Sequence, residues 1–186
     1  MDTTLLQDTF KYFAKFPAFT GVQKNFNVSQ SQRFGSDYSN FQDAIGNMEE
    51  KDLIPGIEDY IFGVDEDMVK RRIQSISGIF LFVDYGAINS DRESDALYEM
   101  DEFRIAITVA FPIKEGTMDP VETMLMHQTM LDYISQIKEK MRADSKRIDL
   151  IKEISFPLEI NPWFSRELMS SSGWSMLFSR RGVGLV

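Results

Sequence analysis

The pattern of hydrophobic and polar positions changes about 50 residues into the chain. In residues 1–51, aromatic side chains are dense and alternate irregularly with Gln, Asn and Ser, with a period of neither two nor 3.6 residues. This pattern predicts an irregular arm whose aromatic side chains anchor one by one, either on the main body of the same chain or on a neighbouring subunit. Its candidate interface residues are Phe10, Tyr12, Phe13, Phe16 and Phe19.

The rest of the chain, residues 52–186, has the patterns of one folded domain and opens with two predicted helices. Apolar residues spaced by three and four predict a helical face over residues 53–64, with Pro55 and Gly56 near its start. A second helix follows Asp65, which is a suitable N-cap. Its core-facing residues would be Met68, Val69 and Ile73.

Two strands follow, joined by a polar connection. Residues 76–85 are rich in β-branched and aromatic side chains and predict a strand buried on both faces. Residues 103–111 alternate large and small side chains, which predicts a strand with one large-residue face. Residues 86–102 are polar and acidic and predict a long, exposed loop. The apolar residues of this loop that we expect to dock on a partner include Leu97, Tyr98 and Met100.

A long helix is predicted from Asp119 to about residue 143. Asp119 precedes Pro120 and lies three residues before Glu122, which is the spacing of a capping box. His127 lies on the flank of the helix's apolar stripe, where a histidine is most often a structural group. The stripe itself consists of Met126, Met130, Ile134, Ile137 and Met141, widened by Val121, Met124, Leu125 and Leu131.

The last third of the chain completes a sheet. Residues 148–160 predict a third strand, in which the change of spacing indicates a bulge near Lys152 and Pro157 indicates an edge position. Residues 161–173 predict a loop, and residues 174–179 alternate as a final strand. The whole order predicts an α+β fold: a helix followed by ββαββ, with a mostly antiparallel sheet of about four strands and the helices packed on one face.

Composition and motifs argue against several classes of function. The 186 residues carry 29 acidic and 20 basic side chains, a net charge of −9 that disfavours recognition of nucleic-acid phosphates. The chain has one histidine and no cysteine, and it lacks phosphate-binding, zinc-protease and nucleophile-elbow motifs. The acidic side chains of residues 84–102 lack the spacing of a calcium loop. We therefore predict no catalytic, cofactor-binding or metal-binding residues.

The apolar runs are also too short for a membrane span, which takes about 18 residues or more. No targeting signal is apparent at the N-terminus, where Asp2 stands in place of a basic region. The sequence therefore predicts a protein that is cytoplasmic when made and that has no membrane partner.

With this element order, residues 65–181 resemble the tail-terminator and tail-completion proteins of long-tailed bacteriophages and prophages. The resemblance lies in the helix after Asp65, the strands ISGIFLFVDYGAI and EFRIAITVAFPI, the long helix from Asp119 and the closing GWSMLFSRRG. It implies a structural protein of the virion that forms a homo-oligomeric ring at the tail end and contacts other tail or neck proteins. The aromatic N-terminal arm is longer than the N-terminal segment expected for this family.

Two other functions fit the same residues. One is a non-catalytic α+β binding module for a peptide or a small ligand. The other is an enzyme that uses the acidic loop and His127, which the missing catalytic motifs disfavour. The solution mass of the chain is the best single measurement for comparing a ring-forming protein with a monomeric or dimeric module, and a monomeric mass would weaken the ring hypothesis.

Overall fold

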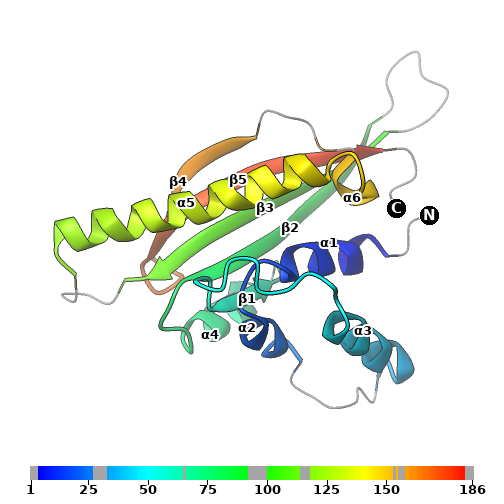
Figure 1. Ribbon diagram of the computed structural model, residues 1–186, viewed down its shortest axis with the longest axis horizontal. Coiled ribbons are helices and arrows are strands. Elements are labelled where there is room, and N and C mark those ends of the chain that lie inside the picture. Colours follow the sequence, from blue (N-terminus) through cyan, green and yellow to red (C-terminus); the bar gives the residue numbers. More distant parts are fainter. Residues whose placement is uncertain are drawn as a thin grey trace.

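The computed structural model describes residues 4–26, 33–64, 66–91, 100–113, 118–152, 154 and 158–182. Figure 1 shows a twisted sheet with a long helix lying across one face. Among these residues the sheet has five strands in the order β1-β2-β3-β5-β4. Their bounds are β1 Asp59–Phe62, β2 Phe80–Asp91, β3 Met100–Pro112, β4 Glu159–Ser165 and β5 Ser171–Gly182.

The sheet is mixed, and the fold is α+β. Strands β1 and β2 run parallel, whereas the pairs β2–β3, β3–β5 and β4–β5 are antiparallel. The predicted count of about four strands is too low because β1 occupies part of residues 53–64, for which we expected a helix. Tyr60 belongs to the core on one face of the sheet and Ile61 to the core on the other. A strand buried on both faces is apolar throughout, so its periodicity resembles that of a buried helix.

The β2–β3 hairpin is longer than predicted. Strand β2 continues to Asp91, and its register shifts between Tyr85 and Ile88. This irregularity hides the two-residue period, which is why the sequence predicted a loop from residue 86 onwards. Met100 is the first residue of β3, while Leu97 and Tyr98 lie outside the described residues.

The long helix, α5 (Pro120–Asp144), confirms the predicted cap and the predicted packing of Met130, Ile134 and Ile137 against the sheet. The side chain of Asp119 accepts hydrogen bonds from the backbone N–H groups of Val121 and Glu122, at 2.8 and 2.9 Å. The Glu122 carboxylate accepts one from the Asp119 N–H at 3.1 Å and completes the capping box. One core joins the large-residue face of β3 to this helix; it includes Phe103, Ile105, Ile107, Val109, Met130, Ile134 and Ile137.

The N-terminal segment is helical where the sequence predicted an irregular arm. It contains α1 (Leu5–Ala14), α2 (Phe19–Gln23) and α3 (Ser36–Gly46). The ring of Phe10 makes edge-on contacts, at centroid distances of 5.0–6.1 Å, with four other aromatic rings. Those rings belong to Phe26, Phe41, Tyr60 and Phe62. The described part of this segment therefore packs on its own chain.

A further helix covers the opposite face of the sheet. Val69 and Ile73 of α4 (Glu66–Ile73) pack with Ile61, Phe80 and Phe82 in a second core. This corrects the prediction that all helices pack on one face. Ala110 belongs to the same core, and a small side chain there lets α4 approach. Met68, which we expected in the core, is exposed instead.

Most of the predicted third strand, residues 148–160, does not belong to a strand of the sheet. It begins with the short helix α6 (Asp149–Lys152), and Ile154 forms an isolated bridge with Arg180 before β4 starts at Glu159. Buried Leu150, Ile151 and Ile154 occur at spacings that a short helix also satisfies. Strand β4 continues through residues 161–165, which we had predicted as loop, and β5 contains the predicted final strand.

Candidate functional site

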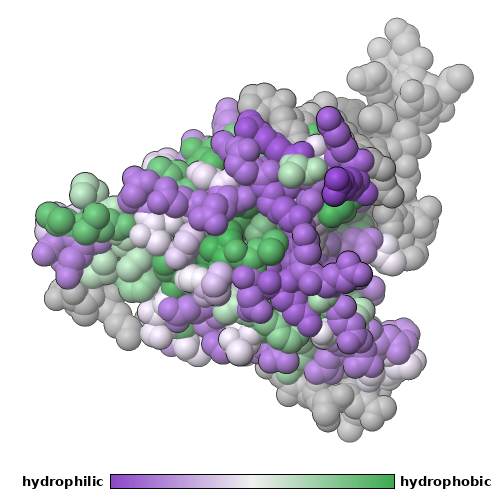
Figure 2. Space-filling view, viewed as in Figure 1, coloured by the Kyte–Doolittle hydropathy of each residue, from purple (hydrophilic) through white to green (hydrophobic). Residues whose placement is uncertain are grey.

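The N-terminal turns of α5 carry an exposed group of large apolar side chains. Val121, Met124 and Leu125 are 60%, 60% and 58% exposed, and we call these three residues the apolar helix end. In Figure 1 this part of α5 extends past the end of the sheet, and in Figure 2 hydrophobic surface gathers there. We had predicted that these residues widen the core face of the helix. That prediction is wrong because, among the described residues, the strands end short of this part of the helix.

Polar and apolar groups surround the apolar helix end. An open groove of about 460 Å³ runs beside it and is lined by Met118, Glu122, Leu125, Met126 and Thr129. The carboxylates of Asp119 and Glu122 are exposed at the start of the helix. The surface thus combines long, adaptable apolar side chains with negative charge, which suits contact with another protein.

His127 lies on the inner side of the same helix. Its Nε2 atom is 2.9 Å from the hydroxyl oxygen of Ser172, and the indole N–H of Trp174 donates to its backbone carbonyl at 2.9 Å. The imidazole also meets the Trp174 ring edge-on at a centroid distance of 6.4 Å. His127 therefore fastens α5 to β5, as expected of a structural residue. That His127 takes no part in catalysis stays a prediction.

A network of charged side chains, in which Lys15 and Asp144 are buried and Glu50 is exposed, lies at the other end of α5. The Lys15 ammonium donates to Asp144 at 2.7 Å and to Glu50 at 3.2 Å. Lys140 donates to the same two carboxylates, at 3.1 Å to Asp144 and 2.7 Å to Glu50. The Tyr12 hydroxyl donates to Asp144 at 2.9 Å, and the Lys15 ammonium lies 3.9 Å from the centre of the Tyr12 ring. The network ties α1 and residue 50 to the C-terminal turn of α5.

The network favours the charged forms of its two carboxylates and of Lys140. Burial by itself would raise the pKa of Asp144, but hydrogen bonds from Lys15, Lys140 and Tyr12 outweigh burial and hold that pKa below its usual value. The hydrogen bond from Lys140 lowers the pKa of Glu50, and the same bond raises the pKa of Lys140. Burial and the nearby Asp144 carboxylate raise the pKa of the Tyr12 phenol, which stays neutral. Because the cations are paired with carboxylates, the network is suited to holding structure together rather than to proton transfer.

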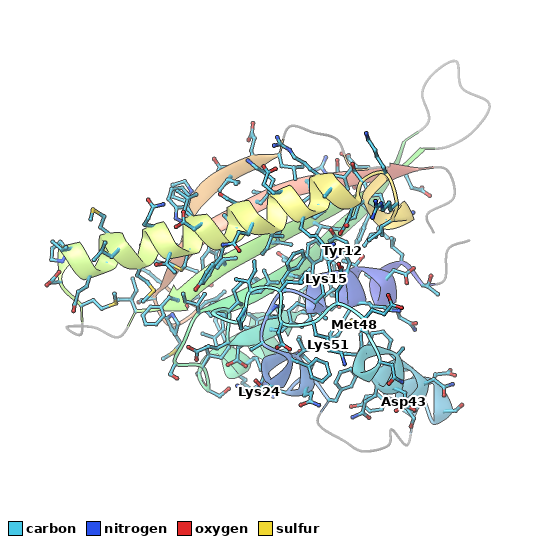
Figure 3. All side chains as sticks on the ribbon, in the orientation of Figure 1. Tyr12, Lys15, Lys24, Asp43, Met48 and Lys51 are labelled. Carbon is cyan, nitrogen blue, oxygen red and sulfur yellow. The ribbon has the colours of Figure 1, made fainter. Side chains whose placement is uncertain are left out.

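An open hollow of about 600 Å³ borders this network, and we call it the α1–α6 hollow. Figure 3 shows Tyr12 of α1, and Lys15 directly after that helix, beside α5, and Met48 on the segment that follows α3. Its apolar lining comes chiefly from Met48, Ile148 and Leu150. Its polar lining comes from Asp8, Lys11, Tyr12, Lys15, Asn47, Glu49 and Glu50.

The structure buries four of the eight predicted interface residues. Phe10, Phe13 and Phe16 are buried in the chain's own core, and so is Tyr12, although Tyr12 also lines the α1–α6 hollow. Phe19 is half-buried and packs against that core, with the Lys51 ammonium 4.5 Å from its ring centre. Leu97 and Tyr98 are outside the described residues, and of Met100 only the place in β3 is described.

Sequence reasoning missed the buried charges altogether. Lys15 and Asp144 are 129 residues apart in the chain, and neither belongs to a recognisable motif. A sequence places polar residues on a predicted helix face, but it does not reveal which of them a distant helix will cover. The one available signal was Lys15 in an otherwise apolar neighbourhood.

The described part of the chain has neither a cluster suited to a metal ion nor a helix suited to a membrane. Within it, no group of three or more His, Cys, Asp or Glu side chains could hold a metal ion. Among the same residues, no helix is both long enough and apolar enough to cross a membrane. No protein-family model, no curated protein and no solved structure matches the chain. The candidate function therefore has to be argued from the surfaces described above.

Proposed function

We propose that this protein is a structural assembly protein of a phage or prophage tail, a ring component of the terminator or completion type. The observation that supports this best is the apolar helix end, where three large apolar side chains stand on the surface of one rigid helix. Exposed groups of this kind, bordered by charge, are typical of protein–protein contact sites. In this proposal the protein acts through its interfaces and performs no catalysis.

The arrangement of elements also supports the proposal. From α4 onwards the chain follows the helix-ββαββ order of the resemblance, with the short α6 inserted between α5 and β4. Its partners are copies of itself and other tail or neck proteins. The net charge of −9 suits a ring through which DNA passes, because an acidic lumen does not grip phosphates.

The test is the solution mass of the chain across the widest concentration range that its solubility permits. The unmodified protein is expected to associate as concentration rises, whereas Met124→Glu and Leu125→Glu are expected to remain monomeric. Both side chains are exposed, so the two variants should unfold at nearly the same denaturant concentration as the parent chain.

Leu6→Glu is the matched control, because Leu6 is an exposed leucine on α1 and is not part of the lining of the α1–α6 hollow. It should associate as the unmodified chain does. If the unmodified chain and Leu125→Glu have the same mass at every concentration, the proposal loses the surface on which it rests.

The α1–α6 hollow favours a second candidate, a non-catalytic binding module. A hollow of about 600 Å³ with apolar and charged lining has the size of a small-ligand or peptide site. This candidate predicts a monomer at all concentrations and a ligand whose binding is lost in Asn47→Trp, a change that fills the hollow from its exposed side.

A further inference from the structure

We infer that the apolar helix end of one copy inserts into the α1–α6 hollow of a second copy, so that the chains join head to tail. This inference rests on the proposed function and names the partner and the surface for the same apolar helix end. It also assigns a role to the hollow.

The two surfaces lie at opposite ends of one long helix. The apolar helix end occupies the first turns of α5, whereas the hollow borders the network around Asp144 and the α6 residues that follow. Figure 1 shows α5 running nearly straight between them. A helix of 25 residues is about 37 Å long, so the two surfaces of one copy cannot meet. Any contact between them joins two copies.

Both surfaces offer apolar side chains beside polar ones. Met124 and Leu125 project from a helix whose start is fixed by the complete capping box of Asp119 and Glu122. The hollow offers an opening of about 600 Å³ with apolar lining from Met48, Ile148 and Leu150. Methionine on both sides lets the surfaces adapt to one another. Burial of apolar side chains from both surfaces away from water stabilises such a contact.

Charge favours the same pairing. Asp119 and Glu122 are exposed beside the apolar helix end, and Lys146 and Arg147 are exposed directly before Ile148 of the hollow. Within the lining, Lys11 and Lys15 are cations and Asp8, Glu49 and Glu50 are anions, so the hollow itself is mixed in sign and the cations that favour the pairing are those beside it. The cations before Ile148 would therefore meet the acidic start of α5, which fixes the orientation of the incoming helix.

Charge also argues against the simplest alternative, a symmetric contact between two apolar helix ends. That contact would bring Asp119 and Glu122 of one copy against the same residues of the other, and like charges across an interface are unfavourable. A contact between two different surfaces is heterologous. Repeating it closes a ring when the rotation permits closure and otherwise gives an open filament.

The first test mixes two variants, each of which lacks one side of the contact. Leu125→Glu disables the apolar helix end, and the double variant Lys11→Glu/Lys146→Glu reverses exposed charges at the hollow. Each variant alone is expected to be monomeric by sedimentation. Their mixture is expected to form a one-to-one dimer and nothing larger, because each such pair keeps one intact contact. A mixture that stays monomeric overturns the inference.

The second test uses the absence of cysteine from the sequence. We expect Leu125→Cys mixed with Asn47→Cys to form a disulfide-linked heterodimer under mild oxidation, because Asn47 lines the hollow and is exposed. Asp132→Cys, on an exposed position in the middle of α5, is the control and should not link to Asn47→Cys. Predominant homodimers of Leu125→Cys would instead show a symmetric contact and overturn the inference.

These experiments separate failure of the inference from failure of the proposed function. Oligomers that dissociate in Leu125→Glu but persist in Lys11→Glu/Lys146→Glu, with no Leu125–Asn47 cross-link, overturn docking in the hollow and leave the proposed function standing. Equal masses for the unmodified chain and Leu125→Glu overturn both. If the charge-reversed variant fails to fold, which circular dichroism detects, the cross-linking pair decides the question.

Discussion

Lys15 is the residue that most clearly links separate parts of this molecule. It is 5% exposed, although a charged side chain loses much hydration energy on burial. The carboxylates of Asp144 and Glu50 and the face of the Tyr12 ring compensate for that loss. Removing one partner would leave a buried charge without compensation, which is the most costly way to break such a network.

We therefore predict that Asp144→Ala lowers the free energy of unfolding by about 3–5 kcal/mol. The measurement is denaturant-induced unfolding of the purified chain. Glu139→Ala is the matched control, because it removes an acid from the exposed pair with Arg142 and should cost about 1 kcal/mol or less. Equal losses in the two variants would show that the buried network contributes no more than a surface ion pair.

The network also predicts how stability depends on pH. Since the folded protein lowers the pKa of Asp144 and of Glu50, their contribution is complete above the ordinary carboxyl pKa of about 4. It decreases as the pH falls through the lower folded values. The pKa of Lys140 is raised, so its contribution is complete below the ordinary lysine pKa of about 10.4 and decreases as the pH rises through the folded value.

The urea concentration at the unfolding midpoint, measured from neutral pH downwards, should decrease as the pH falls below about 4. Asp144→Asn should flatten this acid limb, because one of the titrating groups is gone. An acid limb of unchanged steepness in that variant would assign the acid sensitivity to carboxylates elsewhere in the chain.

At the scale of single elements, helix α5 has two parts with different environments. From Met130 to Met141 its apolar stripe is buried against the sheet, whereas Val121, Met124 and Leu125 are exposed. The amino-acid pattern is apolar in both parts. The difference arises because the sheet extends under only one of them.

Strand β3 provides the corresponding prediction for the core. Ile107 is completely buried and pairs with Val83 of β2 and Met176 of β5. Ile107→Ala is expected to cost about 2–5 kcal/mol of unfolding free energy, because it removes buried methyl groups and leaves a cavity. Leu177→Ala, at an exposed position on the adjacent strand, should cost much less. An unchanged thermal unfolding curve for Ile107→Ala would contradict the packing of β3 against α5.

At the scale of the whole molecule, the main core does not divide at residue 52. Phe13 and Phe16 from the N-terminal segment share it with Phe103 of β3 and Ile134 of α5. The buried network reinforces the connection, since Lys15 and Glu50 come from this segment and Asp144 from α5. The N-terminal helices thus supply part of the interior that covers the sheet.

We predict that a fragment of residues 52–186 does not unfold cooperatively. Without the N-terminal aromatic side chains, the face of the sheet that α1 covers would be exposed to water. Near-ultraviolet circular dichroism during urea titration is the measurement, with the full chain as reference. A sharp unfolding transition of the fragment would establish residues 52–186 as an independent domain, as the sequence pattern suggests.

The sequence by itself determined the elements whose signals are local. Asp119, Pro120 and Glu122 predict the start of α5, because a capping box involves only neighbouring residues. Strand β3 is recognisable from strict alternation over residues 103–111, and the helical period of residues 130–141 marks the buried part of α5. The α+β class follows from the order of these elements.

Tertiary structure alone decided the features that depend on distant neighbours. Residues 59–62 form a strand because β2 offers them a parallel partner, and the N-terminal aromatic residues form helices because one core receives them. The same apolar pattern is buried at Met130 and exposed at Leu125, depending on whether the sheet lies beneath it. Lys15 and Asp144 meet only after the chain has folded, because burial and ion pairing depend on distance in space, which spacing along the sequence does not encode.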